Sequence, residues 1–334
     1  MENYVAKNLA KDPGTAGTSE TSGSSGASGS KRSRIASRLG AAVAATALVG
    51  AGATAAVAVD PPKPYTAATS APSGSALARS GAVSSAPSPE APQYDLFAAD
   101  RANTLYGYIR DGGGALSPRA KIDTGWDAIK WTTQVDHDAD GYADGWWEWD
   151  KNGTMYYAPD DSDTPWTVGG GWNTYNLVVS PGNLGGAAAG DLLARDTTGT
   201  LYVYLGYGTG KVASRYKVGG GWNTYNQIAG NGDLTGDGKA DIVARDASGT
   251  LWLYKGTGNY KAPFEGRTRI GGGWNTYNAL FSMGDLDLDG TTDLIARGND
   301  GSLWRYSGTG NAAAPFAGRK NIGTSGWNTY RLFF

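Results

Sequence analysis

A hexapeptide that recurs at a nearly constant spacing constrains this chain more than any other feature of its sequence. Gly-Gly-Trp-Asn-Thr-Tyr occupies Gly170–Tyr175, Gly220–Tyr225 and Gly272–Tyr277, and Ser325–Tyr330 differs only in its first residue. A degenerate copy surrounds Trp126, and the five motif tryptophans are 46, 50, 52 and 53 residues apart. Such self-similarity is typical of proteins built from one repeated supersecondary unit. The spacing therefore predicts five units from about residue 94 onward.

Each unit has the residue pattern of four short strands. In the fourth unit, Asp241–Asp246 and Thr250–Tyr254 are β-rich runs separated by Ala247–Gly249, which indicates a hairpin. The composition, with 52 Gly, 19 Tyr and 12 Trp, also favours short strands joined by tight turns. Four-stranded antiparallel units at this period are typical of propeller blades, because one blade cannot bury both of its faces alone. We predict an all-β fold, a five-bladed β-propeller.

The two ends of the repeat region complement each other. The first unit begins at Asp95–Asp100, where other units have their second strand, and Arg331–Phe334 aligns with a first strand. The C-terminal strand is thus expected to close the ring and remove an exposed sheet edge. An open solenoid would need polar capping repeats, which the apolar C-terminal residues do not resemble. The predicted blades are about 95–130 plus 328–334, 131–176, 177–226, 227–278 and 279–327.

The residues before the repeats are expected to direct export and then act as a tether. Residues 1–58 form a polar lead, a basic cluster and an apolar run ending in small residues, the order of a secretory signal peptide. An uncleaved membrane anchor is the alternative, although Ala and Gly make this run a poor one. Residues 59–93 are rich in Pro, Ser and Ala, which predicts a disordered linker. We expect a secreted monomer without stable membrane insertion after cleavage.

Three units contain the same acidic loop. It spans Asp136–Asp144 in the second unit, Asp233–Asp241 in the fourth and Asp285–Asp293 in the fifth, with side-chain oxygens at loop positions 1, 3, 5 and 9 and Gly at position 6. Calcium requires six to eight oxygen ligands, which alternate side chains on a tight loop provide. An EF-hand is excluded because Glu is missing from position 12. Turn formation by Asp and Gly is the alternative to metal binding.

The loops predict about three structural calcium ions. In the third unit Gly185 and Ala187 replace two ligands, so no ion is expected there, and Thr235 is expected to weaken the site of the fourth unit. The residue after the loop glycine can add its carbonyl oxygen. The candidate ligands are Asp136, Asp138, Asp140, Tyr142 and Asp144; Asp233, Thr235, Asp237, Lys239 and Asp241; and Asp285, Asp287, Asp289, Thr291 and Asp293.

The loop and the strand after it resemble the FG-GAP, or VCBS-type, repeat of integrin α-subunit heads and many secreted bacterial proteins. The resemblance covers about residues 95–334 and implies a calcium-braced propeller with the side-chain ligands named above. Family rings usually have seven blades, so a count of five is a departure. The Gly-Gly-Trp motif and the Leu-Phe-Phe ending are also similar to tachylectin-type five-bladed lectins, which implies carbohydrate binding.

Standalone catalysis is not expected, because the chain has no Cys and its one His, His137, lies in an acidic loop predicted to face solvent. A net charge of −2 gives no electrostatic basis for binding nucleic acid. Aromatic residues recur at one place on the third strand of each blade and suit a sugar-binding pocket. Packing between blades is the alternative for them and for the motif tryptophans. A glycan is therefore the first candidate partner and an extracellular protein the second; the aromatic candidates are Tyr106, Tyr156, Tyr202, Trp252 and Trp304.

Overall fold

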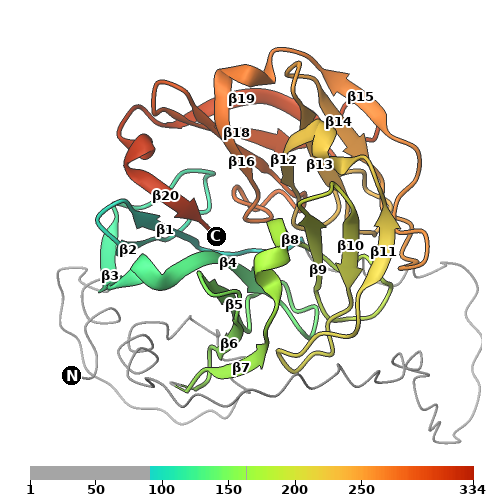
Figure 1. The fold of residues 1–334 in the computed structure, drawn as a ribbon. Helices are drawn as coiled ribbons and strands as arrows, with labels where there is room; N and C mark the ends of the chain where they lie inside the picture. Colours follow the sequence, from blue (N-terminus) through green and yellow to red (C-terminus); the bar gives the residue numbers. More distant parts are fainter. Residues whose placement is uncertain (1–90, 163) are drawn as a thin grey trace, which may run out of the picture.

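The computed structural model describes residues 91–162 and 164–334, which form five four-stranded antiparallel sheets around a central axis (Figure 1). The predicted five-bladed β-propeller is confirmed. The proposed signal segment and nearly all of the proposed linker lie outside the described residues. In the described part, no helix is long and apolar enough to cross a membrane.

The blades follow one another in chain order, and blade 1 is completed from the far end of the chain. Its sheet has the order β20-β1-β2-β3, and the pairing of Ala98 with Phe333 joins β1 to β20 (Figure 1). The predicted closure of the ring by the C-terminal strand is therefore confirmed. Blade 1 comprises β1 (Leu96–Asp100), β2 (Thr104–Tyr108), β3 (Ala120–Thr124) and β20 (Tyr330–Phe333).

The remaining four blades each use four consecutive strands. Blade 2 has β4 (Ile129–Val135), β5 (Gly145–Asp150), β6 (Met155–Pro159) and β7 (Trp166–Gly169). Blade 3 has β8 (Tyr175–Gly182), β9 (Asp191–Asp196), β10 (Leu201–Tyr204) and β11 (Tyr216–Gly219). Blade 4 has β12 (Tyr225–Ala229), β13 (Ile242–Asp246), β14 (Leu251–Tyr254) and β15 (Thr268–Gly271). Blade 5 has β16 (Tyr277–Phe281), β17 (Leu294–Gly298), β18 (Leu303–Gly308) and β19 (Phe316–Gly323).

The repeated hexapeptide connects consecutive blades. Its second glycine is in the left-handed region, as at Gly171 with φ 87°, and permits a one-turn 3-10 helix that starts at the motif tryptophan. The motif tyrosine then begins the next blade, so β8 starts at Tyr175, two residues before the predicted boundary at 177. The 3-10 helices are η2 (Trp126–Ala128), η3 (Trp172–Thr174), η4 (Trp222–Thr224), η5 (Trp274–Thr276) and η6 (Trp327–Thr329).

All five motif tryptophans are buried between blades, none more than 8% exposed. Packing is therefore their role, which was one of the two alternatives that the sequence left open. An arginine on the second strand adds a polar link between blades: Arg195 Nη1 donates to the carbonyls of Trp222, at 2.9 Å, and Tyr225. Arg245 and Arg297 repeat this link, and Arg331 of β20 makes it from blade 1 to blade 2.

Antiparallel connectivity divides the loops between two ends of the ring. The Trp turns and the hairpins between second and third strands are at one end, here called the Trp-turn end. The acidic loops and the connections between third and fourth strands are at the other, here called the acidic-loop end. The entering chain crosses the acidic-loop end, where Gln93 N donates to Gly141 O and Tyr94 N donates to Met283 O.

Candidate functional site

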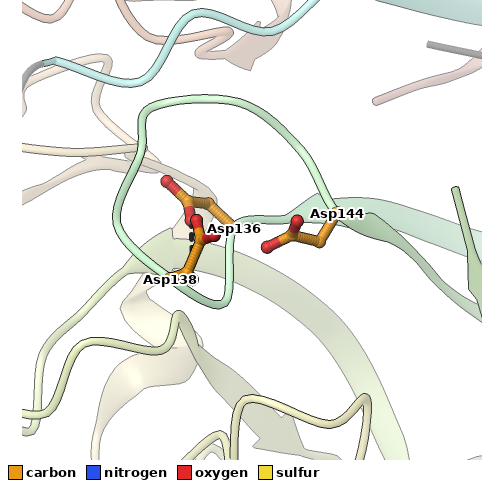
Figure 2. A group of neighbouring side chains, drawn as sticks. All are labelled: Asp136, Asp138 and Asp144. Atoms are coloured by element: carbon orange, nitrogen blue, oxygen red, sulfur yellow. Dashed lines mark hydrogen bonds between the residues drawn. The ribbon is translucent and has the colours of Figure 1, made fainter. Parts of the chain in front are cut away.

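The acidic loop of blade 2 brings three predicted calcium ligands together. One carboxylate oxygen from each of Asp136, Asp138 and Asp144 lies within 4.8 Å of the others. Figure 2 shows the Asp144 carboxylate turned toward Asp136 from the opposite arm of the loop. The Asp136 carboxylate also accepts N–H groups of Ala139 and Gly141, so it shapes the loop as well. Burial raises the pKa of Asp136 to about 6.

Blade 5 assembles a second group, in which Asp285, Asp287 and Asp289 each place a carboxylate oxygen within 4.8 Å of the others. Asp287 Oδ1 is buried and has no hydrogen-bond partner among the described residues, as expected of an atom that faces a cation site. Its Oδ2 instead meets Arg305 Nη2 at 2.6 Å. The residues of this loop therefore fit a calcium ion on three carboxylates and carry a fixed cation beside one of them.

The loop of blade 4 is different. Among the described residues, no group of three carboxylates converges there. Asp237 Oδ2 lies 3.3 Å from Lys255 Nζ, and Thr235 stands where the other loops have Asp. The weaker affinity expected for this site stays a prediction.

The aspartate at loop position 9 has a role that does not require a metal. Asp191 of blade 3, whose loop lacks two of the ligand types, accepts N–H groups from Leu184, Gly185 and Gly206. Asp241 and Asp293 make the equivalent bonds to the glycine at the end of the third strand. Burial raises the pKa of Asp191 to about 6 and that of Asp293 to about 7. This residue therefore ties its loop to the third strand in blades 3, 4 and 5.

The five third-strand aromatics are half-buried between blades, and four of them stack against an arginine that sequence reasoning missed. The guanidinium of Arg319 lies 4.1 Å from the ring centre of Trp304, and that of Arg267 lies 4.1 Å from Trp252. One ring face is thus covered by a cation. The other two pairs are Arg215 with Tyr202, at 4.3 Å, and Arg119 with Tyr106, at 4.5 Å.

A pair of tyrosines holds each of these arginines in place. Arg215 Nη1 donates to Tyr175 Oη at 2.6 Å, and the Tyr175 and Tyr204 hydroxyls are 2.5 Å apart. Tyr204 packs on the motif tryptophan Trp172 at 4.7 Å. The hydrogen bond to Tyr175 is the main cause that raises the pKa of Arg215. The same arrangement recurs with Arg267, Tyr225 and Tyr254; with Arg319, Tyr277 and Tyr306; and with Arg119, Tyr330 and Tyr108.

Between blades 4 and 5 this arrangement lines a shallow, open cavity of about 470 Å³, here called an inter-blade pocket. Its wall from blade 4 is Ile270–Gly273, and blade 5 contributes Tyr306, Phe316 and Arg319. Arg319 is the only charged side chain among the residues that line it. The pocket therefore combines aromatic edges, glycine backbone and one exposed guanidinium.

The junction of blades 1 and 2 lacks the arrangement. Tyr156 stands at the aromatic position, but Pro165 replaces the arginine, and Ala158 and Ile129 replace the two tyrosines. This junction instead buries Glu148, whose Oε1 has no hydrogen-bond partner in the described part of the chain. Burial, reinforced by the charge of Asp123, raises the pKa of Glu148 to about 7.

His137 does not face solvent as expected. It packs 5.7 Å from Trp147 and 5.3 Å from Tyr157, and its Nε2 accepts the Gly210 N–H. Burial lowers the pKa of His137 to about 4. The contacts of His137 are thus with two aromatic rings and a backbone N–H group.

A comparison with known families matches a part of the chain that includes two of the three acidic loops. Residues 233–296 match the FG-GAP-like repeat family. This FG-GAP-like repeat contains the loop of blade 4, the junction with blade 5 and the loop of blade 5. A search of curated protein sequences finds no match to the chain.

Solved structures with similar chains include a lectin and a calcium-binding protein. The BP39L lectin from Burkholderia pseudomallei is 14% identical, with a TM-score of 0.40, over 71% of this chain and 72% of that one. A mutant of AofleA from Arthrobotrys oligospora is 10% identical, with a TM-score of 0.41, over 72% and 76%. Regucalcin from Agrobacterium tumefaciens, described as calcium-binding, is 10% identical, with a TM-score of 0.37, over 70% and 75%.

Proposed function

We propose that this propeller is a secreted, non-catalytic binding module for carbohydrate, with its binding sites at the inter-blade pocket and at the three junctions that share its arrangement of residues. The observation that carries the proposal is the recurrence of one constellation, Trp-Tyr-Tyr-aromatic-Arg, at four of the five junctions between the described blades. Saccharides are bound by aromatic side chains together with a few fixed polar groups. Packing alone does not require an exposed arginine at each junction, because the junction of blades 1 and 2 is closed without one.

Binding sites of low affinity that are arranged around a ring suit a polysaccharide with a repeating unit. Binding at one pocket raises the effective concentration of the polymer at the next, so avidity can exceed the affinity of one pocket by about 10²–10⁴.

The test is binding of the full-length protein to a panel of glycans, chitin and cell-wall polymers, measured for the wild type and for Trp252→Ala with Trp304→Ala. We expect the double variant to bind more weakly than the wild type, because two of the four junctions lose their aromatic ring and avidity falls. Tyr156→Ala, at the junction without the arginine, is the matched control and should bind normally. If no glycan binds above background, the proposal is wrong.

We infer further that calcium braces the loops of blades 2 and 5, and more weakly that of blade 4. Bound calcium would supply a divalent charge shared by several carboxylates, at the opposite end of the ring from the Trp turns. Its role is therefore structural. The test is thermal unfolding with calcium and with excess chelator, where each site stabilises by about 2.7 kcal/mol at a hundredfold excess over Kd. Asp289→Ala should reduce the response and Asp161→Ala, outside the loops, should not.

A protein partner is the second candidate, and a specific surface favours it. Ile109 and Leu288 are 40% and 49% exposed at the acidic-loop end, and Tyr142 is 40% exposed. The blade 1 connection lies between them, since Arg110 stacks at 5.9 Å on Tyr142. Exposed apolar side chains at one end of a molecule are typical of protein contacts. A pull-down from extracellular fluid that loses a partner on Leu288→Asp, and retains it in the variant Trp252→Ala with Trp304→Ala, would select this function.

A further inference from the structure

The inter-blade pocket offers a ligand one cation beside its aromatic residues. The ring faces of Trp252 and Trp304 that meet the arginines are already occupied at 4.1 Å. A pyranose ring that stacks its C–H groups needs such a face. The groups that line the pocket are the guanidinium of Arg319, the glycine backbone and aromatic residues such as Tyr306 and Phe316.

The guanidinium groups are fixed before any ligand arrives. Arg319 is exposed, yet it is stacked on Trp304 and hydrogen-bonded through Nη1 to Tyr277 Oη. A guanidinium carries five N–H donors in a rigid fork, and one nitrogen is used here. The other donors suit a carboxylate or sulfate, which accept paired hydrogen bonds from arginine. Preorganisation of this kind reduces the entropy lost on binding.

A second cation accompanies the arginine in three of the four blades that have one. Lys217 pairs with Tyr202, and Lys121 pairs with Tyr106, each two residues after the arginine. Arg269 takes this place in blade 4, whereas Asn321 takes it in blade 5. In blade 2, where the arginine is missing, Thr167 pairs with the aromatic instead. The second cation therefore adds positive charge at three of the four junctions that have the arginine.

The glycines of the Trp turn leave the pocket open. A Cβ built on Gly271 would meet no atom within 4 Å, and the φ angle of this residue lies outside the left-handed region. Neither packing nor backbone geometry therefore demands glycine at this position. A side chain there would stand in the pocket that Gly271 lines. The glycine therefore leaves the backbone accessible to a ligand.

We propose that acidic saccharides bind at the inter-blade pocket and at the three junctions with the same arrangement, held through a carboxylate or sulfate group by Arg119, Arg215, Arg267 and Arg319. This inference rests on the proposed carbohydrate-binding function and names its ligand class. The anion replaces water at the exposed donors while the sugar contacts the aromatic edges. The pocket between blades 4 and 5 has no lining carboxylate that would repel it.

The test uses the full-length protein and three immobilised polymers: polygalacturonate for carboxylate, chondroitin sulfate for sulfate, and mannan as the neutral polymer. We expect the acidic polymers to bind and mannan to bind at least about tenfold more weakly. Arg319→Gln should weaken binding moderately, and the fourfold arginine-to-glutamine variant should abolish it. Lys151→Gln, an exposed cation of the blade 2 hairpin, is the charge-matched control and should bind as the wild type.

The outcomes separate the two proposals. Equal binding of mannan and the acidic polymers, unchanged in Arg319→Gln and in the fourfold variant, would overturn the acidic-ligand inference and leave carbohydrate binding intact. No binding of any polymer would overturn both. Binding of acidic polymers that Lys151→Gln reduces as much as Arg319→Gln would indicate a nonspecific charge effect and also overturn the inference. Arg319→Lys separates geometry from charge, since it keeps the charge without the fork and should bind several-fold more weakly.

Discussion

The buried ion pair of blade 5 allows a quantitative test of how an acidic loop is held. Arg305 is 5% exposed and its Nη2 lies 2.6 Å from Asp287 Oδ2, with Nε 3.9 Å from Asp293. Removing one partner of a buried pair leaves an uncompensated charge and costs about 3–5 kcal/mol. Since the side chain of Asp287 keeps 18% exposure, we expect the lower end, about 3 kcal/mol, for Arg305→Val without calcium.

Blade 3 supplies the matched control, because Gly185 and Val203 occupy the places of Asp287 and Arg305. The double variant Asp287→Gly with Arg305→Val leaves neither member of the pair. We expect it to recover about 2 kcal/mol relative to the single arginine variant, since residues in one ion pair are not additive.

The assay is urea unfolding of the full-length protein in chelator, followed by tryptophan fluorescence, for the wild type, both single variants and the double variant. Calcium should restore part of the stability of Arg305→Val, because the metal takes over neutralisation of Asp287. Additivity of the two single variants within about 0.5 kcal/mol would refute the reasoning, since it would mean that the two groups do not interact in the folded protein.

Three further predictions concern other parts of the ring. Because the pKa of Glu148 is raised from 4.5 to about 7, the free energy of unfolding should fall by up to about 3 kcal/mol as pH rises between these values. Glu148→Gln should flatten this part of the curve of stability against pH, and an unchanged slope would contradict the prediction. Deletion of residues 330–334 removes β20 and exposes the edge of β1, so the truncated chain should aggregate in light scattering, whereas a soluble monomer would argue against ring closure. Gly114→Ala places a Cβ onto Arg305 Nη1 at a φ of 78°, so it should lower the melting temperature as Arg305→Val does, and a wild-type melting temperature would count against this contact.

The fold could be predicted because the sequence repeats itself. The motif spacing gave the number of blades, and the complementary ends at Asp95–Asp100 and Arg331–Phe334 gave the closure. These features depend on strand order and period, which one sequence displays directly. Blade boundaries were displaced by two residues because the motif tyrosine, assigned to the turn, already belongs to the next strand.

The candidate site was predicted only in part. The loop aspartates and third-strand aromatics were visible as repeats, but the arginines that stack on the aromatics lie within or directly before the fourth strands, which have no hydrophobic pattern. Their signal was available, since Arg215, Arg267 and Arg319 are 52 residues apart. Arg305 and Asp287 lie on different segments of blade 5, so the residue spacing could not predict their contact. The one sign in the sequence is that blade 5 has an arginine where blade 3 has Val203.

The pairing of Ala98 with Phe333 also determines the order in which the molecule can fold. Blades 2 to 5 use neighbouring segments of chain and can form from local contacts, whereas blade 1 must close the longest loop in the ring. Contacts at such separation slow folding. Until β20 arrives, the apolar strand β1 presents an unpaired edge to any other chain. Blade 1, whose first strands precede those of all other blades in the chain, is therefore the last blade to be completed. Its unpaired edge is the place where incompletely folded chains would associate.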